Sequence, residues 1–182
     1  MSTFGNGFGG IKVAAGAATQ SLTTTAGQMV AWAAAGGSNS DMDSNTADGN
    51  VDVVPDKANS RLKVNTPGVY LVMFELSGQL DTAGIVLARI RKNGVAIPGL
   101  TARVQCLTSM SQLVLVGIMR IEKTDLAVPP TLGTFADPAT TGFAGAGAAP
   151  KTECPIDVTL EMASGAQILT INEATLTAIR LR

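Results

Sequence analysis

The chain has 182 residues and contains no histidine. Histidine is the commonest general base and the commonest metal ligand, so its absence counts against triad catalysis and most metal-dependent catalysis. The Gly-rich segment 5–10 has no predicted strand before it and no helix after it, so it does not form a phosphate-binding loop. We therefore expect a protein that is not an enzyme and that uses no cofactor.

Charge and aromatic side chains are also scarce, at 15% and 4% of the residues, and the formal net charge is −1. Such a chain offers little attraction to nucleic acid or to an anionic membrane, and few rings on which bases could stack. No apolar run reaches the ~20 residues that a membrane-spanning helix needs, and no secretory signal is visible at the N-terminus. We expect neither nucleic acid nor a membrane as a partner. Because hydrophobic residues make up 46%, the shortage of charge favours a protein that buries surface against other subunits.

Cysteine is limited to Cys106 and Cys154. They lie far apart in the sequence, and spacing alone does not decide whether they pair. Two reduced thiols are the favoured interpretation, with a disulfide as the alternative.

A polar loop over residues 36–50 carries the one pattern that suggests a metal. Asp41, Asp43 and Asn45 alternate, and Asp52 stands where a calcium loop has its twelfth-position carboxylate. The turn position that requires glycine is occupied by Thr46, however, and the bidentate glutamate is absent. An ordinary surface turn explains the same residues, so we expect no metal site and leave calcium binding by the Asp41–Asp52 loop as the alternative.

The segment Pro67–Leu80 organises the rest of the chain. From Val69 to Phe74 it contains no polar residue, and its β-branched and aromatic content predicts a strand. Side chains alternate between the faces of a sheet, so the face of Tyr70 and Phe74 is apolar and so is the face of Leu71 and Met73. We predict that the first face fills the core and that the second contacts neighbouring subunits.

The segment Gln112–Glu122 shares this property. One of its faces carries Leu113 and Leu115, and the other is also apolar. Two other segments, 85–92 and 156–162, instead alternate apolar and polar residues, which predicts strands with one wet face. Arg89 and Arg91 on the first of them fit a phosphate-binding pair or, more simply, an exposed edge of a sheet.

Turn signals separate eight to ten short strands, and no helix is convincing. This pattern predicts an all-β, jelly-roll β-sandwich of two antiparallel sheets. Residues 1–27 are rich in Gly, Ala and Thr and are expected to form an extended N-terminal arm, followed by the sandwich over 28–182. Five prolines and the run GFAGAGAAP in 123–155 predict a long loop insertion.

Three segments resemble a known family. Pro67–Phe74, the strand-plus-turn Ile90–Gly94 and the closing Ala174–Leu181 are similar to strands of the jelly roll shared by tumour necrosis factor and the complement globular heads. The resemblance covers residues 28–182 and implies a compact homotrimer built around an inner sheet. The loop at 123–155 is longer than this family usually has, and the Gly/Ala/Thr-rich N-terminal segment looks more like a phage structural protein.

We therefore expect a virion protein, made in the host cytoplasm and placed on the capsid exterior. It would be a trimeric decoration (cement) protein that binds the major capsid protein and stabilises the head; the alternative is the receptor-binding or adhesive head domain of a phage fibre. The residues expected in self-association are Leu71, Met73, Leu113 and Leu115. The residues expected to contact the capsid are Phe4, Phe8, Ile11, Phe135 and Phe143.

Overall fold

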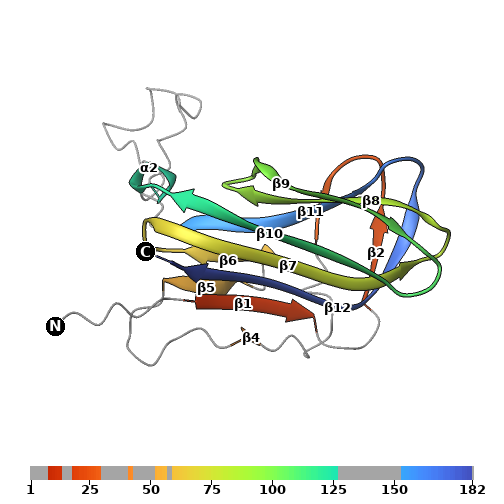
Figure 1. Cartoon of the computed structure of the whole chain (residues 1–182), viewed down its shortest axis with the longest axis horizontal. Coiled ribbons are helices and arrows are strands. Elements are labelled where there is room, and N and C mark those ends of the chain that lie inside the picture. Colours follow the sequence, from red (N-terminus) through yellow and green to blue (C-terminus); the bar gives the residue numbers. More distant parts are fainter. Residues whose placement is uncertain are drawn as a thin grey trace, which may run out of the picture.

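The computed structural model describes residues 8–13, 18–29, 41–42, 52–56, 59–126 and 153–181. They form two antiparallel sheets that lie face to face (Figure 1). The first, called the β7 sheet, is built from β10 (Ser111–Ile121), β7 (Gly68–Leu80), β12 (Gln167–Arg180), β1 (Phe8–Val13) and β4 (Asp41–Met42), in this order, with β2 (Ala18–Leu22) also on β12. The second, called the β8 sheet, is built from β5 (Val53–Asp56), β6 (Arg61–Val64), β11 (Cys154–Met162), β8 (Gly84–Lys92) and β9 (Val95–Cys106), with β3 (Gly27–Gln28) on β11. The predicted all-β sandwich is confirmed; α2 (Lys123–Leu126) is a single short turn.

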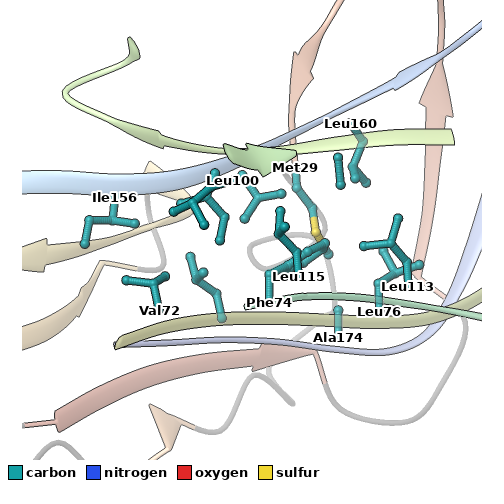
Figure 2. Close-up of a cluster of buried hydrophobic side chains, with 14 of the residues drawn as sticks. Met29, Val72, Phe74, Leu76, Leu100, Leu113, Leu115, Ile156, Leu160 and Ala174 are labelled. Carbon is teal, nitrogen blue, oxygen red and sulfur yellow. The ribbon is translucent and has the colours of Figure 1, made fainter. Parts of the chain in front are cut away.

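The core lies between the two sheets and contains the predicted face of β7. Tyr70, Val72 and Phe74 are completely buried, and they face the inward side chains of β8 and β11 across the sandwich. Figure 2 shows Phe74 and Leu115 from one sheet, Leu100 from the other and Met29, which follows β3, in the layer between the sheets, and all four belong to one core cluster. The apolar faces predicted for segments 85–92 and 156–162 are the buried faces of β8 and β11.

The described part of residues 1–27 belongs to the sandwich and is not a separate arm. β1 pairs with β12 over its whole length, from Phe8–Ile179 to Val13–Ala174. A Cβ on Gly9 would come 2.5 Å from the carbonyl oxygen of Val53. The glycines that suggested a flexible arm thus include a position where two strands approach too closely for any side chain.

Two glycines shape the β9–β10 region. A Cβ on Gly117 would lie 1.9 Å from Cδ2 of Leu100, so a side chain there would displace Leu100. Pro98-Gly99 is a pair that ordinarily ends a strand, but β9 runs through it. Gly99, with φ of +82°, instead sits in a bulge where the β8–β9 register shifts, and β9 continues to Cys106. The left-handed backbone conformation costs glycine little free energy because glycine has no Cβ. The strand therefore bends at Gly99 without ending.

The predicted hairpin at Asn93-Gly94 is present. Both residues have positive φ, 51° and 78°, as a type I′ turn requires. This turn joins β8 to β9 and makes β9 one edge of its sheet. β10, the next strand, is an edge of the other sheet, so β9 and β10 together form one side wall of the sandwich (Figure 1).

Candidate self-association surface

The outward face of the β7 sheet carries apolar side chains on neighbouring strands. The register places them in cross-strand rows, because directly paired residues point to the same face. One row consists of Ile118, Leu71, Ile179 and Phe8. The next consists of Val116, Met73, Thr177 and Gly10. We call these two rows, together with Val114, the apolar face.

The β10 end of this face is the most exposed. Val114, Val116 and Ile118 retain 55%, 51% and 65% of their accessible surface. Leu71 and Met73 on the neighbouring β7 are half-buried. Scattered apolar residues on a surface need no explanation, but a contiguous patch on one sheet and its edge strand marks an interaction surface.

The structure divides the residues expected in self-association. Leu71 and Met73 lie on the outward side, as predicted. Leu113 and Leu115 are 1% and 7% exposed and lie in the core. Their cross-strand partners are Leu76 and Phe74, so they share the inward face of β7. Because both faces of β10 are apolar, periodicity could not choose between them, and the pairing register decides.

Of the residues expected to touch a capsid, two are described. Phe8 is 37% exposed and belongs to the apolar face. Ile11 is completely buried, because β1 is an inner strand of the β7 sheet and Ile11 pairs with the core residue Leu176. It is therefore unavailable to a partner. Phe4, Phe135 and Phe143 lie outside the described residues.

The apolar face becomes polar toward the end of the sandwich where β7 turns into β8. The next row contains Glu75, Thr175 and Lys12 beside Val114. A groove of about 290 Å³ opens here and is lined partly by Glu75 and Glu173. The ion pairs of the described residues include neither of these carboxylates.

The outward face of the β8 sheet carries ion pairs in place of apolar side chains. Arg91 donates from Nε and Nη2 to both oxygens of Asp157, at 2.6 and 2.8 Å. Arg89 contacts Glu161 at 2.6 Å, and this hydrogen bond raises the pKa of the Arg89 guanidinium. Both arginines thus have carboxylate partners on the adjacent strand, which disfavours a phosphate-binding pair. The expected exposed edge is wrong as well, because β8 lies between β11 and β9 and its arginines are on a sheet face.

Asp52, the expected twelfth-position carboxylate, has protein partners. It is 2% exposed, accepts a hydrogen bond from Thr66 Oγ1 at 2.5 Å and pairs with Arg180 at 3.1 Å. Arg180 also donates to the carbonyl oxygen of Pro67. This network ties the end of β12 to the chain before β5 and β7. Asp43 and Asn45 lie outside the described residues.

Across the described residues there is no group of three or more acidic, Cys or His side chains suited to hold a metal ion. The same part of the chain includes no helix with the length and apolar character to cross a membrane.

Cys106 and Cys154 are free and buried, at opposite ends of the β8 sheet. Cys106 pairs with Gly84 at the start of β8, whereas Cys154 lies beyond Lys92 at its end. At about 3.3 Å per residue they are roughly 25 Å or more apart, and a disulfide needs Cα atoms within about 7 Å. The favoured reduced state therefore agrees with the fold.

A second exposed apolar cluster, missed from the sequence, lies at the end of the sandwich that holds the β7–β8 turn. Leu107, Met110 and Ile168 are 45%, 62% and 48% exposed. Backbone hydrogen bonds from Leu80 to Leu107 and from Asp81 to Ile168 bring the three loops together. In the sequence, this cluster is indicated by two large apolar residues, Leu107 and Met110, inside the polar turn between β9 and β10.

The comparisons with known proteins identify the fold. No family model matches the chain, and no curated protein matches it in sequence. Among solved structures it is similar to Eiger TNF from S. frugiperda, with a TM-score of 0.54 and 7% identity over 97% of this chain and 94% of that one. It is also similar to murine APRIL, with a TM-score of 0.53 and 7% identity over 97% and 100%. The PRD1 vertex protein P5 gives 0.50 and 10% identity over 97% of both chains.

The chain thus has a TNF-like jelly roll, as the resemblance implied. Identities of 7–10% establish the fold alone, and fold does not fix function.

Proposed function

We propose that this chain is a structural virion protein that assembles into a homotrimer and decorates the exterior of a phage capsid by binding the major capsid protein. The observation that carries the proposal is the apolar face. It covers neighbouring strands of one sheet and includes an edge strand, and its exposed side chains are those that water solvates poorly. Burial between identical subunits removes that surface from water.

A cyclic trimer suits this fold because each subunit offers two different surfaces. One is the apolar face, and the other is the side wall formed by β9 and β10. When the side wall of one subunit covers the face of the next, the contact is head-to-tail, and such contacts close into rings. The edge of β10 is then protected from pairing with other chains.

Attachment to a capsid needs a surface that remains free in the trimer. The cluster of Leu107, Met110 and Ile168 lies at one end of the sandwich, away from the apolar face. Three copies around an axis parallel to the strands would present three such clusters at the same end. Phe4, Phe135 and Phe143 are proposed to add contacts from segments 1–7 and 127–152.

The mechanism is mechanical. A protein that binds the assembled shell and not the free capsid subunits stabilises the shell by mass action, in proportion to the logarithm of its concentration over its Kd. No catalytic step is part of this function. The likeness to a protein named as a vertex protein supports a place in the virion.

The test is a pair of measurements on the purified chain. Light scattering gives its mass in solution, and co-sedimentation with empty heads of the phage that encodes it gives its binding. A trimer that sediments with heads and raises their thermal stability is the expected result. A monomer that ignores heads and binds cell-surface glycans would overturn the proposal and favour the receptor-binding alternative.

A further inference from the structure

Glu75 borders the apolar face, and self-association through apolar side chains does not explain it. Its side chain is exposed and points outward between Val114 on β10 and Thr175 on β12. Among the described residues no cation forms an ion pair with it. A carboxylate that loses water at an interface without gaining a cation opposes association.

Arg103 is an unpaired cation on the other surface. It is exposed on the edge strand β9, where it points outward beside Leu87 of β8. The ion pairs of the described residues include no partner for Arg103 either. The side wall therefore presents a free positive charge where β9 borders the outward face of the β8 sheet, and the border of the apolar face presents a free negative one.

The two charges also lie at the same height along the strands. Arg103 is three residues before Cys106, where β9 ends, and Val114 is three residues after Ser111, where β10 begins. Glu75 pairs directly with Val114. Both charges are thus about 10 Å from the same end of the sandwich, at ~3.3 Å per residue. Rotation about an axis parallel to the strands leaves height unchanged, so it brings Arg103 of one copy level with Glu75 of the next.

We propose that Glu75, at the border of the apolar face, binds Arg103 on the side wall of a second copy of this chain, and that this ion pair sets the register of the assembly. The inference rests on the proposed self-association and specifies which surfaces meet. Apolar side chains supply the affinity, whereas the charge pair penalises any shift along the strands.

Two other cations compete for this role within the described residues. Lys12 is in the row of Glu75, two strands away across Thr175, a separation of roughly 10 Å. Arg120, at the opposite end of the face, would approach Glu75 in a two-fold, face-to-face dimer. It already contacts Glu122 at 3.5 Å, whereas Arg103 has no such partner.

The test is a charge reversal measured by light scattering and sedimentation equilibrium. The variants Glu75→Arg and Arg103→Glu are each expected to weaken the trimer at least tenfold, as removal of one partner from a desolvated pair does. The double variant Glu75→Arg/Arg103→Glu is expected to recover an assembly within about threefold of wild type, because the pair is restored with its charges exchanged. Lys12→Glu and Arg120→Glu serve as matched controls and are expected to leave the trimer intact.

The outcomes separate the two proposals. A monomeric wild-type chain overturns both the self-association and the pair. The wild-type chain could form a trimer while the association of the double variant is weakened by the product of the two single effects. This result would overturn only the ion pair. If the double variant Glu75→Arg/Arg120→Glu instead restores an assembly, and this assembly has the mass of a dimer, the Glu75–Arg103 pair is overturned in favour of the face-to-face arrangement.

Discussion

The two sheets of this sandwich share a core but differ on their outward faces. On the β7 sheet the central outward positions are Leu71, Met73 and the exposed Val116. On the β8 sheet the corresponding positions hold Arg89, Arg91 and the carboxylates that bind them. On the β8 sheet the charges of β6, β8 and β11 are paired inside the subunit, and Arg103 on the edge strand β9 is the exception. The outward face of the β7 sheet instead has apolar surface bordered by an unpaired carboxylate.

The difference indicates how each face meets its surroundings. A ladder of ion pairs is stable against water and needs no further partner, although each exposed pair adds little stability. An apolar face in water has the opposite property, since it gains free energy when another surface covers it. Under the proposed self-association, one sheet faces solvent and the other faces the neighbouring subunit.

The largest effect is expected when the same negative charge is placed on each of the two outward faces in turn. Leu71→Asp puts a carboxylate on the apolar face and is expected to abolish the trimer at micromolar concentration, because the charge loses water on association. Light scattering gives the mass, and circular dichroism shows that the subunit remains folded.

Lys63→Asp is the matched control on the β8 sheet. Lys63 is outward and half-buried on β6, distant from the β9 edge. We expect a less stable subunit that remains trimeric. If Leu71→Asp remains trimeric as well, the apolar face is not the self-association surface.

The fold could be predicted from the sequence because the local signals agreed with one another. The alternation in β8 and β11, the Asn93-Gly94 turn and the apolar run after Gly68 all predict strands of one sandwich. The prediction was wrong where a sequence pattern fits two arrangements of a strand equally well. β10 is apolar on both faces, so only pairing with β7 reveals that Val114 faces outward and Leu113 inward.

The N-terminal strands were missed for a different reason. Gly9 and Gly10 have low strand propensity, and the segment was therefore expected to form an arm. The register with β12 and the burial of Ile11 come from tertiary contacts with distant residues. No local pattern in residues 8–13 encodes those contacts.

A smaller effect is expected when an ion pair on the β8 sheet is broken. Arg91→Leu leaves the Asp157 side chain, 10% exposed, without its bidentate partner. We expect a loss of about 1–3 kcal/mol in the free energy of unfolding, since a carboxylate is left with little water and no cation. Urea unfolding followed by circular dichroism measures it.

The double variant Arg91→Leu/Asp157→Leu tests whether the pair stabilises or only avoids a penalty. It is expected to regain most of the lost stability, because an apolar pair of similar shape often replaces a buried ion pair without cost. A double variant as unstable as Arg91→Leu would show that the ionic contact itself is needed. The mass of the assembly should not change in either case.

A third, smaller effect is expected from pH on the same sheet. Burial by itself raises the pKa of Asp56, but hydrogen bonds from Asn59, Arg61 and Lys63 outweigh it and hold the pKa below 3.8. A carboxylate with a lowered pKa in the folded state adds stability that is present above the unfolded value and lost as pH falls through the folded value.

Asp56→Asn should therefore destabilise the chain at pH 7 and reduce the fall in stability between neutral pH and pH values below 3.8. Urea midpoints at several pH values give the slope for both proteins. Equal slopes of stability against pH would mean that the Asp56 cluster contributes nothing to acid sensitivity. Lys123→Gln, at an exposed site on α2, serves as the surface control.

The smallest effect is expected from the thiols, because the sandwich relies on packing and not on a covalent bridge. Burial raises the pKa of Cys106, and burial together with the nearby Asp125 carboxylate raises the pKa of Cys154 to about 12. Since the thiolate is the reactive species, a soluble alkylating reagent at pH 8 should modify neither residue in the folded protein and both after unfolding. Reducing agent should leave the melting temperature unchanged. A single thiol that reacts under native conditions would show that its end of the β8 sheet opens locally, and it would identify the less stable end of the sheet that faces solvent.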